Sequence, residues 1–394
     1  MFALFASGEL APREASAQSQ KAKNIVYVES NDPNGNAIFA FSRANDGSLT
    51  PLPGSPFPAG GTGITPTFAL GPFDSDQEII VNPSQTMLFA VNGGSDTIAV
   101  FGINKDGSLT PVNGSPFPSG GSNPVSVGLT GNILCVVNKD EDPDHPGLFL
   151  PNYTSFRVTG QGQLIPIPNS TVDDDLGSDP SQALPSPDGN LLFGDDFLGG
   201  LLRTFRIQSN GRLSPLDAQA LPPAEFADTG APPLPLGLAV HPTQPLLYVG
   251  FVTINRIGIY SYKKSGALNF LRTVPDSGNG VCWLTMNKQA TRLYASNTGD
   301  PSVSVYDLTV DPSEPIEIQK ATMNTKGGGY QIALDSSEKF LHVVIQQNSA
   351  NATVTDNALH VFSVGSDGKL TEIPSSPTVL PVPNLVRPQG VAAL

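Results

Sequence analysis

Short stretches of alternating apolar and polar residues recur along the chain, separated by turns rich in glycine, asparagine and aspartate. One unit consists of an apolar strand, a loop, an alternating strand, a tight turn and a short Leu-Thr-Pro strand. Its first copy covers residues 25–51, with Asp46-Gly47 at the tight turn, and its second covers 87–111, with Asp106-Gly107 there. Period-two alternation predicts β-strands, and Asp-Gly favours the turn of a hairpin.

The unit occurs seven times. Spacings between copies are roughly 46 to 62 residues, the size of one four-stranded propeller blade. The equivalent positions of the first apolar strand are Tyr27, Phe89, Cys135, Phe193, Tyr248, Tyr294 and His342. The last residues, 389–394, resemble the strand that precedes this position in other copies. We therefore predict an all-β, seven-bladed β-propeller of four-stranded antiparallel blades over residues 24–394, closed by pairing of the C-terminal strand with the N-terminal blade.

Composition narrows the function classes. The 394 residues include 40 glycines and 38 prolines, and only 14% are charged, which argues against a helical bundle or coiled coil. Apolar runs are too short for a transmembrane helix, which needs roughly 20 residues. The net charge of −14 makes nucleic acid a poor partner, because the phosphate backbone would be repelled. Cys135 and Cys282 lie in apolar runs, which predicts buried free thiols.

Residues 1–23 differ from the repeats. A short apolar start is followed by Ala15-Ser16-Ala17, which resembles a small-x-small cleavage site. We interpret this segment as the remnant of an export signal, which predicts a periplasmic or secreted protein. A disordered leader on a cytoplasmic protein is the alternative.

Loop lengths predict which rim of the ring carries function. With the strands of a blade named A to D from the axis outward, the A–B and C–D connections share one rim, and the B–C and D–A connections share the other. The long insertions all fall in the second group, and they cover residues 53–77, 139–152, 169–180, 217–235 and 347–357. Because elaborated loops on a rigid scaffold concentrate function, we expect a ligand on that rim, near the mouth of the central channel.

The ends of the B strands are predicted to form a ring of side chains near this mouth. Five of the seven are polar and two are apolar, which suits a small polar ligand held against an apolar wall. The ring consists of Ser30, Asn92, Asn138, Asp196, Phe251, Asn297 and Ile345. Asparagine and aspartate at strand ends also commonly cap their own turns, so a purely structural role stays open.

Several segments carry a family resemblance. The repeated Asp-Gly-Ser-Leu-Thr turn, the segments Phe57-Pro58-Ala59-Gly60-Gly61 and Phe117-Pro118-Ser119-Gly120-Gly121, and the strand Leu247-Tyr248-Val249 are similar to those of the lactonase-type seven-bladed propellers. That family includes 6-phosphogluconolactonase-like proteins and carboxymuconate cyclases. The resemblance extends from Asn24 to Leu394 and implies the propeller fold more strongly than any activity.

The polar positions usual in that family are largely replaced. Ser181 stands where the resemblance implies a histidine, Val252 where it implies a glutamate, and Thr298 where it implies an arginine, whereas Gln346 is kept. A carboxylate and an arginine persist nearby, in Asp195, Asp196 and Arg203. We predict these three as catalytic residues, with Asp196 as the base. The predicted substrate-binding residues, which include Asn138, Asn297 and Arg256 as oxyanion donors, are Ser30, Asn92, Asn138, Ser181, Phe251, Arg256, Asn297 and Gln346.

The resemblance thus implies a lactonase-like hydrolase that acts on a small sugar lactone or similar cyclic ester. The alternative is a non-catalytic propeller that binds a protein or glycan, and a cyclase or isomerase would require more cations at the mouth. No metal site is predicted from histidine spacing. The acidic runs 138–145 and 173–179 could supply oxygen ligands to calcium, but a solvated loop is the favoured interpretation of each.

Overall fold

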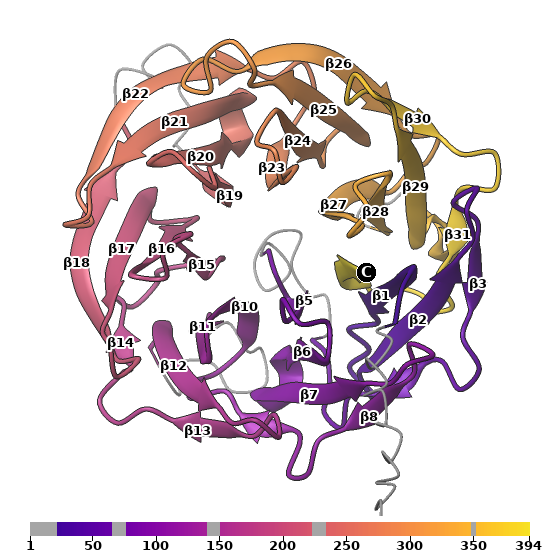
Figure 1. Ribbon diagram of the computed structural model, residues 1–394, viewed down its shortest axis with the longest axis horizontal. Coiled ribbons are helices and arrows are strands. Elements are labelled where there is room, and N and C mark those ends of the chain that lie inside the picture. Colours follow the sequence, from indigo (N-terminus) through magenta and orange to yellow (C-terminus); the bar gives the residue numbers. More distant parts are fainter. Residues whose placement is uncertain (1–21, 65–75, 140–149, 223–233, 348–351) are drawn as a thin grey trace, which may run out of the picture.

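The computed structural model describes residues 22–64, 76–139, 150–222, 234–347 and 352–394. Seven antiparallel sheets are arranged radially around a central axis, with the chain running once around the ring (Figure 1). This arrangement confirms the predicted seven-bladed propeller. No helix in these ranges is long and apolar enough to cross a membrane. The predicted leader falls almost entirely on residues 1–21, which lie outside the described part of the chain.

Each blade contains four main strands, ordered from the axis outward. Blade 1 consists of β32 (Gln389–Ala393), β1 (Ile25–Glu29), β2 (Ala37–Arg43) and β3 (Leu49–Pro51). Blade 2 consists of β5 (Ile79–Val81), β6 (Met87–Asn92), β7 (Thr97–Ile103) and β8 (Leu109–Pro111). Blade 3 consists of β10 (Pro124–Thr130), β11 (Ile133–Asn138), β12 (Asn152–Val158) and β13 (Leu164–Pro166). Blade 4 consists of β15 (Leu184–Pro185), β16 (Leu191–Asp196), β17 (Leu201–Ile207) and β18 (Leu213–Ala220).

The other three blades follow the same order. Blade 5 consists of β19 (Pro235–Val240), β20 (Leu246–Phe251), β21 (Arg256–Tyr262) and β22 (Leu268–Pro275). Blade 6 consists of β23 (Val281–Met286), β24 (Arg292–Asn297), β25 (Ser302–Asp307) and β26 (Ile316–Thr322). Blade 7 consists of β27 (Gly328–Leu334), β28 (Phe340–Gln346), β29 (Ala358–Val364) and β30 (Leu370–Glu372). Two-residue strands extend four blades at the third strand, namely β4 (Phe57–Pro58), β9 (Phe117–Pro118), β14 (Val172–Asp173) and β31 (Thr378–Val379). Among the described residues, three short 3₁₀ helices lie in B–C connections, namely η1 (Gly93–Ser95), η3 (Val252–Ile254) and η4 (Val354–Asp356).

The C-terminal strand closes the ring as predicted. Strand β32 pairs antiparallel with β1, with Tyr27 opposite Ala392, and the N–H of Leu394 donates to the carbonyl of Ile25 at 2.8 Å. An apolar cluster that includes Val28 and Val344 packs blade 1 against blade 7. Closure therefore pairs the inner edge of β1, which would otherwise be unpaired.

Hydrogen bonds from B strands to the next blade's C–D turn connect neighbouring blades. The Tyr27 hydroxyl donates to the carbonyl of Gly107 at 2.8 Å, and the Tyr294 hydroxyl donates to that of Gly368 at 3.1 Å. Gly107 has φ +87°, and a Cβ there would lie 2.7 Å from the Ile25 side chain. The Asp-Gly turns are therefore needed both for the hairpin and for close approach between blades.

The strand order places the B–C and D–A connections on one rim, as predicted. The segments between described ranges fall in these connections: 65–75 precedes β5, 140–149 separates β11 from β12, 223–233 precedes β19, and 348–351 separates β28 from β29. The predicted long insertions thus lie partly outside the described residues. At this rim the structure describes the ends of the A and B strands around the channel, the 3₁₀ helices of the B–C connections and the remaining parts of the long connections.

Candidate functional site

Two neighbouring cavities lie along the innermost strands, around the axis of the ring. Their volumes are about 270 Å³ and about 240 Å³. Both are lined by Asp76, Gln77 and Ile332, so they meet at the D–A end of blade 2. The first cavity extends along blades 4 to 6, and the second extends along blades 1, 2 and 7. These two cavities locate the candidate site in the central channel.

Asp76 is the titratable residue that lines both cavities. It lies three residues before β5, and its side chain is largely buried, because only 8% of the residue is exposed. One carboxylate oxygen accepts the N–H of Gln77 at 2.8 Å, and the other lies 3.5 Å from the side-chain nitrogen of Gln182. Burial raises the pKa of Asp76 to about 7, the Gln77 N–H lowers it, and the nearby charge of Asp195 raises it.

Gln182 fixes the side chains around Asp76. Its amide oxygen accepts the N–H of Leu238 at 2.6 Å, and its amide nitrogen donates to the Gln77 side-chain oxygen at 2.8 Å. The orientation of the Gln182 amide follows from these two bonds, because only the oxygen can accept from a backbone N–H. In turn, the Gln77 oxygen is engaged by this bond, and Gln77 lines both cavities. Blades 2, 4 and 5 are joined at this point.

A buried ionic cluster lies next to this end of the channel, between blades 3 and 4. Lys139 and Asp179 form an ion pair at 2.8 Å with both side chains fully buried. Arg203 pairs with Asp174 at 3.1 Å and with Asp196 at 3.1 Å. Burial raises the pKa of Asp174 to about 7 although Arg203 lowers it, and burial likewise raises the pKa of Asp179 despite Lys139. The carboxylates of this cluster outnumber its two cations, so charge pairing offsets their burial only in part.

Asp195 connects the ionic cluster with Asp76. Its side chain is fully buried, and burial raises its pKa to about 7. The Ser181 hydroxyl and the Lys139 ammonium lower this pKa, and the charge of Asp196 raises it. Neither carboxylate oxygen makes a hydrogen bond of ordinary geometry with any described residue. Asp195 and Asp76 are therefore two interacting carboxyls that both titrate near neutral pH.

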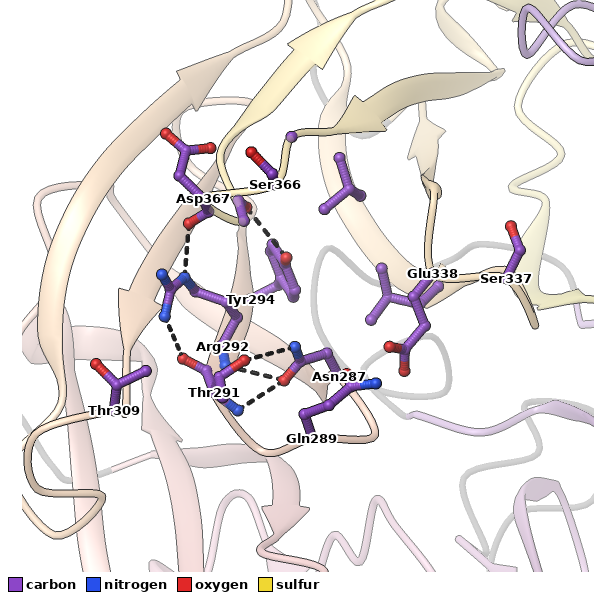
Figure 2. A pocket seen from close by; sticks show the side chains of 14 residues that line it. Asn287, Gln289, Thr291, Arg292, Tyr294, Thr309, Ser337, Glu338, Ser366 and Asp367 are labelled. Atoms are coloured by element: carbon purple, nitrogen blue, oxygen red, sulfur yellow. Dashed lines mark hydrogen bonds between the residues drawn. The ribbon is translucent and has the colours of Figure 1, made fainter.

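Another cavity, of about 360 Å³, lies on the opposite rim between blades 6 and 7 (Figure 2). The Arg292 guanidinium donates to the carbonyl of Asp367 at 2.8 Å and to the carboxylate of Asp307 at 2.8 Å. Asn287 accepts the backbone N–H groups of Thr291 and Arg292. A similar groove of about 450 Å³ lies between blades 2 and 3. Such grooves arise because neighbouring blades diverge from each other toward the outside of the ring. Their polar groups are largely hydrogen-bonded to one another.

Comparisons with known proteins identify the fold. No family model matches the sequence, and no curated protein matches it. The periplasmic gluconolactonase PpgL of Pseudomonas aeruginosa is similar, with a TM-score of 0.71 and 15% identity over 93% of this chain and 98% of that one. A protein of Bacteroides fragilis described as a candidate 6-phosphogluconolactonase has a TM-score of 0.68 and 17% identity over 96% and 99%. One of Bacteroides uniformis with the same description has a TM-score of 0.69 and 16% identity over 93% and 98%.

The chain has the same overall fold as these three proteins. At these low identities the likeness extends to the fold and not to the substrate or the site. The resemblance inferred from the repeats is confirmed at the level of the fold.

The propeller brings four of its predicted site residues together. Asp195, Asp196, Arg203 and Ser181 all belong to blade 4 and lie in or beside the ionic cluster. Asp196, the predicted base, is already engaged: it accepts the N–H groups of Asp179 and Gly199 and pairs with Arg203. These contacts give Asp196 a structural role, and its catalytic role stays a prediction.

The other predicted residues are spread around the ring and not gathered at one point. Four of them are buried and hydrogen-bonded to a side chain of their own blade. These pairs are Ser30 with Asn36, Asn92 with Thr97, Asn138 with Asn152, and Asn297 with Ser302. Phe251 is buried in the apolar core between blades 4 and 5, and Arg256 donates to the Thr273 hydroxyl. Gln346 is buried, and its amide has no hydrogen-bond partner among the described residues. Their substrate-binding roles stay predictions.

Sequence reasoning missed the residues nearest to the cavities. Asp76 and Gln182 precede A strands, whereas the predicted ring of side chains follows the B strands. Lys139 immediately follows Asn138, the residue that the sequence predicts for the site. A usable signal is present, because a glutamine precedes the apolar residues of the innermost strand in two copies, as Gln182 before Ala183-Leu184 and Gln331 before Ile332.

The acidic runs do not form a described metal site. Residues 140–145 of the first run lie outside the described residues, and in the second run Asp174 and Asp179 are paired with Arg203 and Lys139. Across the described ranges, no three histidine, cysteine, aspartate or glutamate side chains are arranged to hold a metal ion. The two cysteines are buried and free, as predicted.

Proposed function

We propose that this lactonase-like propeller hydrolyses a lactone in its central channel, with Asp76 as the general base. The observation that carries the proposal is that Asp76 lines both channel cavities and has a pKa raised to about 7. A carboxylate of ordinary pKa is a weak base at neutral pH, whereas one that titrates near 7 can both accept and return a proton.

In the proposed reaction, the Asp76 carboxylate takes a proton from a water molecule while the oxygen of that water molecule attacks the lactone carbonyl carbon. The bond between that carbon and the ring oxygen then breaks, and protonated Asp76 returns the proton to the departing alkoxide. The side-chain NH₂ of Gln77 is the candidate donor to the negative oxygen formed in between, because Gln182 engages the Gln77 oxygen and leaves the NH₂ available.

The residues predicted from blade 4 have supporting roles in this scheme. Asp195 raises the pKa of Asp76 through its charge, and it is therefore a positioning residue. Arg203 and Asp196 hold the ionic cluster in place. The scheme does not require the predicted substrate contacts of Asn138, Asn297 or Arg256.

Two features of the comparisons agree with the proposal. Similar structures include proteins named as lactonases, and one of these is described as periplasmic, which is consistent with export of this chain. The competing function is a non-catalytic propeller that binds a protein or glycan. It is favoured by Ser181, Val252 and Thr298, which replace the histidine, glutamate and arginine that the family resemblance implies.

The test is hydrolysis of a panel of δ- and γ-lactones by the purified protein, followed by proton release with the spontaneous rate subtracted. We expect Asp76→Asn to lower kcat by about 100-fold or more, since a general base contributes roughly 10² to 10⁴. Asp307→Asn, which removes a carboxylate outside the channel, is the matched control and should leave kcat unchanged. A wild-type protein that hydrolyses no lactone in the panel would leave the binding propeller as the function. Equal rates for wild type and Asp76→Asn would remove Asp76 from its assigned role.

A further inference from the structure

We propose that the central channel opens to solvent at the A–B rim, where the connections are short, and that substrate reaches Asp76 from that side. The rim with the long B–C and D–A connections, where loop length alone predicts a ligand, is then the closed end. The route to Asp76 rests on the proposed function, whereas the open and closed ends are properties of the channel itself.

The innermost strands become exposed only at the A–B rim. Every A strand starts at a D–A connection and ends at an A–B turn, so the A strands all run in the same direction around the axis (Figure 1). In β10, β19, β23, β27 and β32, every residue is buried except the last one or two, which are half-buried. Solvent therefore reaches the A–B ends of these strands more than their D–A ends.

The two channel cavities lie in the same half of the channel. Val240 and Met286, at the A–B ends of β19 and β23, line the larger channel cavity, and Ala392, near the A–B end of β32, lines the smaller one. Residues earlier in the same strands, such as Leu236 and Trp283, line neither cavity. Both cavities therefore extend from Asp76 toward the A–B rim.

Hydrogen bonds cross the channel at the level of Asp76. They join blade 2 to blades 4 and 7, which are not its neighbours in the ring. The Gln182 amide on blade 4 donates to the Gln77 side chain at 2.8 Å, and the Gln331 amide on blade 7 donates to Glu78. A bond that skips a blade must pass inside the innermost strand of that blade, so residues 76–78 lie across the channel. We call residues 76–78, with Gln182 and Gln331, the channel floor.

A buried apolar cluster lies on the D–A side of the channel floor. Tyr330 immediately precedes Gln331, and its ring centroid lies 4.7 Å from that of Trp283. Only 2% of Tyr330 and 0% of Trp283 are exposed. Both pack in one cluster with Leu236 of blade 5 and Phe197 of blade 4. Within the described residues, the channel floor and this cluster together close the D–A end of the channel.

Cysteine accessibility along two strands tests which end is open. On β23, Thr285→Cys places a thiol in the larger channel cavity, whereas the native Cys282 belongs to the apolar cluster. A buried thiol reacts only after local opening, so we expect a bulky, water-soluble methanethiosulfonate to modify the Thr285→Cys variant at least about 100-fold faster than Cys282. On β19, Val240→Cys and Leu236→Cys form a second pair with the same expectation. Peptide mass mapping identifies the modified thiol.

The modified proteins then test the route to Asp76. Modification of Thr285→Cys should lower kcat/KM for lactone hydrolysis by about 100-fold or more, the contribution of a general base that substrate no longer reaches. Thr253→Cys is the control, because Thr253 is exposed on η3 at the opposite rim. Its modification should leave kcat/KM unchanged. The same variants before modification supply the reference rates.

The outcomes separate the open end of the channel from the proposed function. Equal rates at both ends, faster modification at Cys282 and Leu236→Cys, or slow modification at all four positions would each overturn the proposal, even if lactones are hydrolysed. Cys282 needs no substitution, so the comparison on β23 holds even if Leu236→Cys does not fold. If the protein hydrolyses no lactone, accessibility still decides which end is open. If it does, loss of activity on modification of Thr253→Cys and not of Thr285→Cys would move the route to the other rim.

Discussion

Asp76 in the channel and Asp307 beside the groove between blades 6 and 7 are both carboxylates near polar neighbours, yet their pKa values move in opposite directions. Burial raises the pKa of Asp76 to about 7, with one backbone N–H to oppose it. The Thr309 hydroxyl and N–H lower the pKa of Asp307, and Arg292 lowers it further. The number of donors relative to burial therefore decides which carboxylate keeps a proton at neutral pH.

The difference between these two carboxylates explains why the polar cavity between blades 6 and 7, although larger than either channel cavity, is not the candidate active site. The groove in Figure 2 is lined mainly by polar side chains, but its strongest donors and acceptors are used within the protein. The channel end has fewer polar groups, and one of them has a pKa suited to proton transfer. Reactivity in this fold is expected where hydrogen bonding is incomplete, and not where polar residues are most numerous.

The largest expected effect is in the pH dependence of lactone hydrolysis. If Asp76 is the base, kcat should rise about tenfold per pH unit below pH 7 and level off above it, a total of about 100-fold between pH 5 and pH 8. A base with a lowered pKa, such as Asp307, would already be fully ionised at pH 5. Proton-release assays in a series of buffers, corrected for spontaneous hydrolysis, measure the profile. A flat profile between pH 5 and pH 8 would contradict the assignment of Asp76.

The second largest expected effect is that of Asp76→Asn on the free energy of unfolding. The folded-state pKa of Asp76 lies above its unfolded value, so its contribution to stability is fully present at low pH and is lost as the pH rises from about 4 to about 7. Asp76→Asn removes this loss and should be more stable than the wild type at pH 8, by about 2 to 4 kcal/mol. The two proteins should be equally stable near pH 3. Urea unfolding at both pH values is the measurement.

Asp307→Asn is the counterpart on the other rim. It removes a half-buried ion pair with Arg292 at the protein surface, so the free energy of unfolding should change by less than about 1 kcal/mol at pH 8. If Asp307→Asn raised the free energy of unfolding as much as Asp76→Asn does, the reduced negative charge of the protein, and not the burial of Asp76, would explain the gain in stability.

Most of the architecture could be predicted from the sequence because it repeats. Turns such as Asp106-Gly107 and the spacing of the B strands indicate seven blades, and residues 389–394 resemble an A strand without a blade of their own. The antiparallel strand order alone decides which connections share a rim, and the sequence shows which of them are long. These features depend on backbone geometry, which local sequence encodes directly.

The site was harder to predict because it depends on which way single side chains turn. Asn138 ends β11 as expected but bonds to Asn152 on the adjacent strand, whereas the next residue, Lys139, reaches the ionic cluster. Asp76 stands before a strand of only three residues and follows a long connection, so no repeat alignment included it. A shift of one residue at a strand end reverses the direction of a side chain, and sequence patterns locate strand ends less accurately than that.

The smallest expected effect tests the coupling between the two channel carboxyls. Asp195→Asn removes a charge that raises the pKa of Asp76, so the midpoint of the pH profile of kcat should move to lower pH. A merely structural role for Asp195 would lower the plateau of kcat without moving the midpoint. Asp173→Asn, an exposed carboxylate on β14, is the control and should leave the midpoint in place. A midpoint that stays at the wild-type value in Asp195→Asn would show that burial alone raises the pKa of Asp76, and it would remove Asp195 from the proposed mechanism.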